Sequence, residues 1–144
     1  LPGYLAGLRP RTEITARGRR LMERMGISEQ AASGVTEVSG GQLQRAGICR
    51  ALINDPGIVF ADEPTGALNS ATALQILDLL GEIHTSGTTL VMVTHDSQVA
   101  ARADRVLVLV DGQITEDLLL GRYEEADGPS RLTTVTEALQ RHSV

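Results

Sequence analysis

The sequence predicts an α/β fold in which a parallel sheet ends in an antiparallel hairpin. Three short apolar runs, at residues 58–61, 88–94 and 105–110, have the length and composition of buried strands. A segment of helical periodicity lies between the first two runs, and residues 98–102 form a short helical turn before the third. The pair Asp111-Gly112 then predicts a tight turn into a partner strand.

The first 54 residues are predicted to be mainly helical. Residues 1–10 contain two prolines and two glycines and are expected to form a loop. A helix is expected from Thr12 to Met25, ended by Gly26, and a second from Gly41 or Gln42 to Ile53. The first of these helices carries the arginines Arg17, Arg19, Arg20 and Arg24. They have two interpretations: a solvated helix face, or a docking surface for an acidic or membrane-embedded partner.

The remaining residues are predicted to form the sheet and its helices. The clearest helical pattern, Ser70 to Ile83, has apolar side chains at i, i+3, i+4 and i+7, and Asn69 or Ser70 can cap its start. The expected strands are Ile58–Ala61, Thr88–Thr94, Arg105–Val110 and Gln113–Thr115. From Glu116 onward the pattern weakens: residues 127–130 form a break, and residues 132–144 are expected to be an amphipathic helix or a loose tail.

Size and composition are those of an ordinary globular domain. The chain has 144 residues, of which 42% are hydrophobic and 22% charged. The formal net charge of −5 argues weakly against nucleic acid as a partner, and one Phe, two Tyr and no Trp leave almost no stacking surface for single strands. The single cysteine, Cys49, excludes an internal disulfide and is expected to be a buried small apolar residue.

A glycine-rich segment, Ser39-Gly40-Gly41-Gln42, stands immediately before the second helix. Two glycines let a backbone approach an anion closely, and the free amides and positive dipole end of a helix start favour phosphate. Ser39 adds a hydroxyl donor. By itself the segment leaves two interpretations open: a phosphate-binding loop, or an ordinary loop and helix cap.

Acidic and imidazole side chains follow the first two predicted strands. Asp62 and Glu63 follow the first, and His95 follows the second. Because ligands of open parallel sheets bind at the carboxyl ends of the strands, Asp62 is suited to Mg²⁺ and Glu63 to orienting or deprotonating an attacking water. His95 is suited to contact a γ-phosphate or to hold that water. Taken alone, the two acids are also explained by a loop before Pro64, and His95 by a loop histidine.

Lysine is absent from the sequence, so all 13 residues counted as Lys and Arg are arginine. The phosphate-binding loop G-x-x-x-x-G-K-[ST] therefore cannot be present. The chain begins at Leu1, which we interpret as the start of a fragment, although N-terminal processing has the same appearance.

The order of these segments resembles the C-terminal half of an ABC-type ATPase over residues 1–117. Val38 to Arg45 resembles the signature loop and its helix, Ile58 to Gly66 the Walker B strand and turn, Ala67 to Ser70 the D-loop, Thr94 to Asp96 the switch region, and Arg105 to Asp117 the closing hairpin. The motif ADEPTG at residues 61–66, with LPGYLAGL upstream at residues 1–8, is most similar to sequences of one branch of the family. That branch serves lipoprotein release, macrolide export and peptide-antibiotic efflux.

The resemblance implies an incomplete P-loop NTPase core, with ATP and Mg²⁺ as ligands and ATP hydrolysis as the activity of the complete protein. Because ABC domains work as head-to-tail pairs, it divides the site residues into two sets. Ser39, Gly40, Gly41 and Gln42 would act on nucleotide held by a partner domain, and Asp62, Glu63 and His95 on nucleotide held by the missing half of the same domain. Asn69, also a nucleotide-site residue, stands where the D-loop usually has Asp, which implies altered hydrolysis or coupling unless the amide is tolerated.

The resemblance also implies partners and a division of the chain. The partners are a transmembrane permease, a second ABC ATPase domain and the missing N-terminal half with Walker A and the Q-loop, and the location is the cytoplasmic face of the cell membrane. The implied parts are a helical signature subdomain (1–54), the C-terminal part of the RecA-like core (55–117) and a C-terminal helix or tail (118–144).

Consequences for the isolated chain follow from the same resemblance. Alone it is expected to bind MgATP weakly or not at all, and to form a swapped dimer, repack its sheet or require the upstream half. Two other functions stay open: a catalytically inactive scaffold or regulatory half-domain that lends its signature loop to a partner, and a non-transport ABC ATPase.

Overall fold

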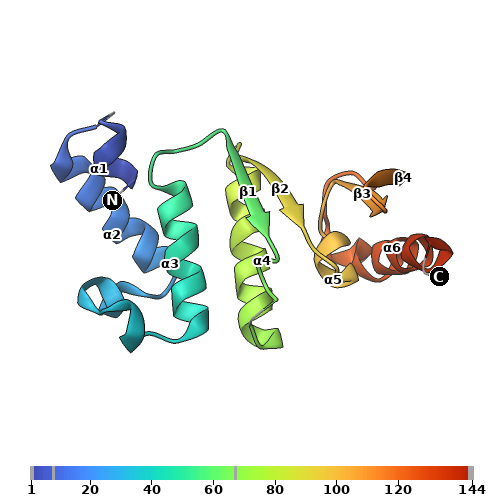
Figure 1. Ribbon diagram of the computed structural model, residues 1–144, viewed down its shortest axis with the longest axis horizontal. Coiled ribbons are helices and arrows are strands. Elements are labelled where there is room, and N and C mark those ends of the chain that lie inside the picture. The colour runs from blue at the N-terminus through green and yellow to red at the C-terminus, as the bar shows by residue number, and fades with distance from the viewer. Residues whose placement is uncertain (1, 8, 67, 143–144) are drawn as a thin grey trace. The chain divides into compact units, whose positions relative to one another are not determined.

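The computed structural model describes residues 2–7, 9–66 and 68–142. They belong to two compact units, residues 1–93 and residues 94–144 (Figure 1). Some sequence expectations fall outside the described residues: Leu1 and Leu8 in the N-terminal segment, Ala67 in the D-loop, and residues 143–144 at the end of the last helix. None of the helices in the described ranges combines the length and the apolar content that a bilayer crossing requires.

Three helices form the N-terminal part of the first unit. They are α1 (Pro2–Ala6), α2 (Arg11–Arg24) and α3 (Gly40–Leu52), and the short 3₁₀ turns η1 (Ser28–Ala32) and η2 (Val35–Glu37) connect the last two. The expected loop over residues 1–10 is therefore wrong for residues 2–6. Pro2 is compatible with a first helical turn, where its missing amide is not needed. Gly3 lets α1 pack closely on α2, because a Cβ at Gly3 would lie 2.8 Å from Cγ2 of Ile14.

The arginines of α2 do not form one uniform face. Arg17 is half-buried and donates to the carbonyls of Ile53 and Leu52 at 2.9 and 3.0 Å, where α3 ends and its last carbonyls lack helical partners. Arg24 pairs with Glu82 at 3.1 Å. Arg17 and Arg24 thus make contacts with other elements of the unit, and Arg19, Arg20 and Arg24 are the exposed members of the set.

A parallel two-stranded sheet and a long helix complete the first unit. β1 (Ile58–Asp62) pairs with β2 (Thr89–Val93), and α4 (Ser70–Thr85) lies against one face of this sheet (Figure 1). The shared core contains Leu21, Met25, Ile27, Cys49, Leu52, Val59, Ile76, Leu79, Leu80 and Ile83. This core joins α2, α3 and α4 to the sheet, and it confirms that Cys49 is buried. Burial raises the pKa of the Cys49 thiol to about 11.

The other face of the β1–β2 sheet is apolar and exposed. Its large side chains Ile58, Phe60, Val91 and Val93 have exposed fractions of 54%, 77%, 43% and 63%. The expectation that the first strand is buried on both sides is therefore wrong within the described residues, which cover only the α4 side. Parallel strands are normally covered by helices on both faces. The exposed face thus has the composition of an interior surface.

The second unit contains an antiparallel hairpin and two helices. β3 (Arg105–Val110) pairs with β4 (Gln113–Leu119), and α5 (Ser97–Ala100) and α6 (Gly128–His142) accompany them, with the turn η3 (Glu125–Asp127) before α6. β4 continues four residues beyond its predicted end at Thr115, past a register shift between Val108 and Leu109. The expected break at residues 127–130 contains the start of α6. The amphipathic-helix expectation is confirmed through His142, and the loose-tail alternative is wrong there.

A buried arginine fastens α6 to the loops around the hairpin. Arg131 has 6% of its surface exposed. It donates to the carbonyls of Ala101, Ala103, Gly121, Arg122 and Leu120 at 2.9, 2.6, 3.0, 3.0 and 3.4 Å. The ring of Tyr123 lies 5.4 Å from Cζ of Arg131, within the range of a cation–π contact. Arg131 therefore supplies donors to two separate chain segments, residues 101–103 and 120–122.

A carboxylate on β4 holds the end of α6. Glu116 accepts a hydrogen bond from Arg141 on each of its oxygens, both at 2.8 Å, and Nε2 of His142 lies 3.0 Å from Oε1. The hydrogen bonds from Arg141, opposed by desolvation and aided by His142, lower the pKa of Glu116 from its ordinary 4.5 to about 2.

Acid is expected to release this end of α6. Because the pKa of Glu116 is lower in the folded chain than in the unfolded chain, its stabilising effect is complete above about pH 4.5 and is lost as the pH falls toward about 2. Thermal melts of the wild type and of Glu116→Gln, followed by circular dichroism, should show a Tm difference that closes on acidification. A difference that is the same at every pH would contradict this role of Glu116.

Candidate functional site

The glycine-rich segment is the N-terminal cap of α3. The Ser39 hydroxyl accepts a hydrogen bond from the Gln42 amide at 3.3 Å, and the Gln42 side-chain oxygen accepts one from the Ser39 amide at 2.8 Å. This reciprocal pair is a capping box, so the cap interpretation is correct as local geometry. It does not use the first-turn amides of Gly40 and Gly41, which have no acceptor within the helix. An anion at this helix start would meet those amides.

The start of α3 lies beside the start of α4. A Cβ at Gly41 would lie 3.4 Å from Leu68 and 3.6 Å from Thr72, whereas a Cβ at Gly40 would meet no atom within 4 Å. The side chain of Gln44 also donates to the carbonyl of Pro64 at 3.0 Å, in the turn that follows β1. These contacts hold the glycine-rich loop, the turn after β1 and the start of α4 together in the first unit. Sequence reasoning gave Gln44 no separate role; its only signal was its place in the segment after the glycines.

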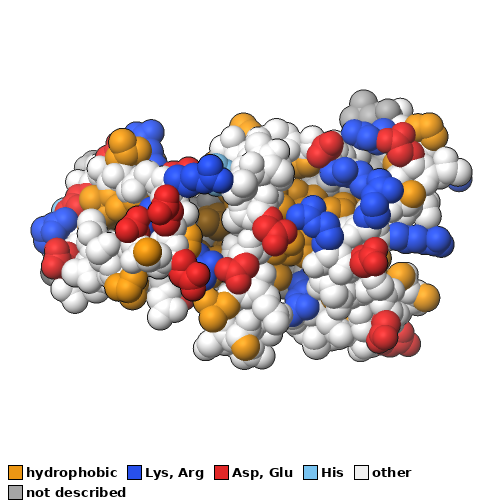
Figure 2. All heavy atoms as spheres, turned by 180° about the vertical axis from the view of Figure 1, so that it is seen from behind, with side chains coloured by type: hydrophobic (Ala, Val, Ile, Leu, Met, Phe, Trp, Pro, Cys, Tyr) orange, Lys and Arg blue, Asp and Glu red, His pale blue; other side chains and the backbone are white. Residues whose placement is uncertain are grey.

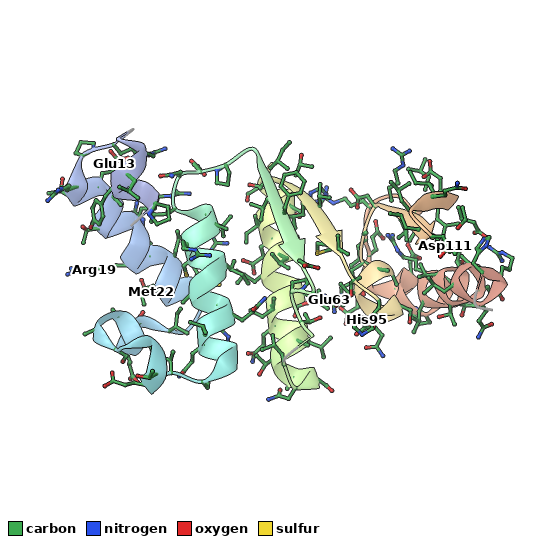
Figure 3. All side chains as sticks on the ribbon, in the orientation of Figure 1. Glu13, Arg19, Met22, Glu63, His95 and Asp111 are labelled. Carbon is green, nitrogen blue, oxygen red and sulfur yellow. The ribbon has the colours of Figure 1, made fainter. Side chains whose placement is uncertain are left out.

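The two acids occupy the carboxyl end of β1, where Figure 3 labels Glu63. Asp62 is the last strand residue, pairs with Val93 in the parallel register and is exposed. Glu63 follows with φ of 43°, in the left-handed region that a residue with a Cβ rarely adopts. Its amide donates to the carbonyl of Val93 at 2.9 Å and its carbonyl accepts from Gly66 at 3.2 Å. These bonds hold a backbone conformation that costs about 1–3 kcal/mol and is commonly found at functional sites.

Asn69 caps α4. Its side-chain oxygen accepts a hydrogen bond from the Thr72 amide at 2.9 Å, and its backbone is extended as an N-cap requires. Asn and Asp are nearly equal at this position of a helix. The presence of Asn where the D-loop pattern has Asp is thus compatible with the local fold.

Truncation of the Asn69 side chain should destabilise the first unit modestly. Asn69→Ala removes the cap and is expected to lower the free energy of unfolding by ~1 kcal/mol, whereas Asn69→Asp keeps the acceptor and adds a favourable charge at the dipole. Urea denaturation of both variants measures the difference. Equal losses for Ala and Asp would show that the capping hydrogen bond is not the stabilising feature.

His95 lies in the second unit, between β2 and α5, and its side chain is exposed. Its neighbour Asp96 caps α5 by accepting the Gln98 amide at 2.8 Å, and the Asp96 amide donates to the Thr94 hydroxyl at 3.1 Å. The residues after β2 therefore form a helix cap, and the His95 side chain within this segment is exposed. The other predicted site residues, Ser39 to Gln42, Asp62, Glu63 and Asn69, lie in the first unit.

The carboxylates at the end of β1 suit a cation that takes most of its ligands from substrate phosphates and water. Across residues 2–7, 9–66 and 68–142, no three His, Cys, Asp or Glu side chains are grouped to hold a metal ion. Mg²⁺ in nucleotide enzymes typically takes one or two carboxylates together with substrate phosphates and waters. An exposed Asp62 at a strand end is compatible with that arrangement.

The first unit thus holds a helix start with first-turn amides close to the turn that follows β1 and its two acids. Comparison with known proteins identifies the class. The family model described as ABC transporter matches residues 6–66, which include the glycine-rich loop and both acids. Together with the relatives and structures below, this match shows that the chain belongs to the ABC transporter family, whose members bind ATP.

Its curated relatives are much longer proteins. The macrolide export ATP-binding/permease protein MacB of Rhodospirillum rubrum is 46% identical over 117 residues, which are 81% of this chain and 18% of the relative. The pyoverdine export ATP-binding/permease protein PvdT of Pseudomonas aeruginosa is 44% identical over the same length, again 81% of this chain and 18% of the relative. The chain thus spans about a fifth of these relatives, and the resemblance to the macrolide-export branch is confirmed.

Solved structures confirm the fold. A dimeric structure of the ATP-binding cassette MJ0796, in a post-hydrolysis state bound to ADP and Pi, is 36% identical, with a TM-score of 0.70 over 80% of this chain and 50% of that one. A second dimeric structure of the same cassette matches equally well, at 37% identity and a TM-score of 0.70 over the same shares of both chains. The α/β architecture with a parallel sheet and an antiparallel hairpin is therefore that of the ABC ATPase core.

Proposed function

We propose that this chain supplies the signature loop and the hydrolytic side chains of an ABC transporter motor that uses MgATP. The observation that carries the proposal is the close packing of three segments in the first unit. Gly41 lies against the start of α4, and Gln44 bonds to the turn that begins with the strained Glu63. The amides that we propose to bind phosphate thus lie close to the turn that follows β1 and its acids.

The proposed roles follow from the chemistry of each group. Mg²⁺, when bound, would offset the charge of the phosphates, with Asp62 holding it directly or through water. Glu63 would accept a proton from the attacking water, and His95 would hydrogen-bond the γ-phosphate or that water. The amides of Gly40 and Gly41, with Ser39 and Gln42, would meet the nucleotide of a partner domain, and Asn69 would lie at the same seam.

A second polypeptide half would cover the bare face of the β1–β2 sheet and supply Walker A and the Q-loop. Support comes from the four exposed apolar side chains on that face, and from the matched cassettes, of which the chain covers half. By this proposal, the isolated chain binds MgATP weakly or not at all.

The proposed partners are a permease and a second ABC ATPase domain, on the cytoplasmic face of the cell membrane. The relatives named export ATP-binding/permease proteins and the dimeric cassette support both partners. The proposed parts are the helical signature subdomain (residues 1–54), part of the ATPase core (55–117) and the C-terminal helix or tail (118–144).

Fusion to an upstream half tests this function. The chain would be joined to the segment that precedes the matched region in the Rhodospirillum rubrum relative, and ATP binding and phosphate release would be measured for the chain and the fusion. We expect binding and turnover only in the fusion. Ordinary ATP affinity of the chain alone would refute the need for a second half. Binding without turnover in the fusion would favour the scaffold or regulatory alternative.

A further inference from the structure

A hollow of about 470 Å³ lies between α4 and the end of α2, with a side chain of α3 in its wall. The apolar part of its lining is Met25, Ile76 and Leu79, whose exposed fractions are 3%, 1% and 9%. Its volume is within the range of small-molecule sites. Figure 2 shows acidic and basic side chains along the boundary between α4 and the helices α2 and α3, with apolar side chains recessed between them. None of the described residues that line the hollow belongs to the proposed nucleotide site.

Arg45 gives the hollow a positive charge that no carboxylate among the described residues neutralises. It lies on α3, is half-buried and lines the hollow. Its guanidinium donates to the carbonyl of Met25 at 3.1 Å and to the side-chain oxygen of Gln75 at 2.9 Å. Both acceptors are uncharged, and these bonds use only part of the five N–H donors of a guanidinium. Arg45 is therefore held in place by α2 and α4, with donors left for an anion in the hollow.

Two carboxylates on α4 also line the hollow. Asp78 and Glu82 stand at i and i+4, so they share one face of the helix. Glu82 forms an ion pair with Arg24 at 3.1 Å, and these two side chains are 66% and 51% exposed. An ion pair so open to water is weak, so a ligand can separate its members at little cost. The hollow thus offers acceptors for a cationic group as well as donors for an anionic one.

We propose that the hollow binds a free α-amino acid with an aliphatic side chain. The carboxylate of the ligand pairs with Arg45, its ammonium pairs with Asp78 or Glu82, and its side chain covers the apolar part of the lining. A simple anion would be repelled by the two carboxylates and a simple cation by the guanidinium groups, whereas a zwitterion satisfies both. Binding uses no nucleotide and goes beyond the proposed function.

L-Leucine is the probe, and two compounds with the same aliphatic group test its two charges. Isocaproate lacks the ammonium, and isoamylamine lacks the carboxylate. Titrations of the full chain at neutral pH, followed by nuclear magnetic resonance, give the dissociation constants. We expect saturable binding of leucine and at least about tenfold weaker binding of each singly charged compound, because each leaves one charged wall of the hollow without its partner. Equal affinities for leucine and either compound, or no saturable binding of leucine, would overturn the proposal.

Arg45→Met tests the anion partner. Arg50→Met is the matched control, because Arg50 is an exposed arginine of the same helix and lies outside the lining. We expect Arg45→Met to weaken leucine binding about tenfold or more and Arg50→Met to leave it unchanged. Because Arg45 also bonds to two other chain segments, circular dichroism checks the fold of both variants.

Asp78→Asn tests the cation partner without touching Arg45. Asp78 is exposed and asparagine has the same size, so the fold should be retained. Since Glu82 remains, we expect leucine binding to weaken only about threefold, and isocaproate binding not to weaken. Unchanged leucine binding in Asp78→Asn or in folded Arg45→Met would contradict the proposal. Displacement of leucine by inorganic phosphate would also overturn it and assign the hollow to simple anions.

Discussion

In the fusion that supplies an upstream half, Glu63→Gln is expected to lower the rate of ATP hydrolysis by ~10²–10⁴-fold while ATP binding is retained. The amide keeps the size and hydrogen-bonding reach of the carboxylate but cannot take a proton from water. Glu63 is held in a left-handed backbone conformation by bonds to Val93 and Gly66, and neither bond uses its side chain. Because both backbone bonds remain and glutamine matches glutamate in size, the substitution should keep the local backbone conformation.

Glu29→Gln is the matched control for this experiment. Glu29 lies in η1 of the same unit and is exposed, so the same change of charge there should leave turnover unaffected. Phosphate release and nucleotide binding are measured for both variants. If Glu63→Gln hydrolyses ATP at the rate of the parent fusion, Glu63 is not the general base, and the strain at its backbone has another origin.

Arg131→Met is expected to destabilise the second unit by about 3–4 kcal/mol. Methionine has a similar length and fills the same space, but it donates no hydrogen bond to the five carbonyls that Arg131 serves. Buried carbonyls left without donors lose more than the net value of their bonds, because they were already removed from water. The loss should appear in α6 and in the two loops at residues 101–103 and 120–122.

Hydrogen–deuterium exchange locates this effect. Protection of α6 and β4 should fall strongly in Arg131→Met, while the helices α2 and α3 of the first unit keep theirs. Arg131→Lys should be intermediate, because an ammonium cannot reach several carbonyls with a planar set of donors. Arg122→Met, at an exposed position, controls for loss of positive charge. A uniform small change across the chain would mean that the carbonyls find other donors.

Residue preferences for turns and helix caps, which involve only adjacent positions, predicted much of the secondary structure. Gly26 follows α2 with φ of 63°, and Asp111 and Gly112 both have positive φ, as the hairpin turn requires. Asn69 caps α4 as expected. Such predictions succeed because the preference of each residue type for a backbone angle or a cap depends on only a few adjacent positions.

Two elements show where this local reasoning was insufficient. Prolines and glycines near the N-terminus indicated a loop, yet α1 forms there because Gly3 permits close packing against Ile14. β4 was predicted too short because a register shift breaks its alternation and because its acids face partners far along the chain, Glu116 meeting Arg141 and Asp117 meeting Arg105. Both features depend on contacts that residue order does not display.

The sequence by itself determined the family, because the order and spacing of several short motifs can be read directly from the residues. This reading needs no knowledge of their three-dimensional surroundings. It also named the acids and glycines proposed for the site. Only the tertiary structure decided that Glu63 is strained, that Arg131 is buried among carbonyls, and that one face of the β1–β2 sheet is bare. Burial and strain arise when segments distant in sequence meet, and local preferences carry no information about that meeting.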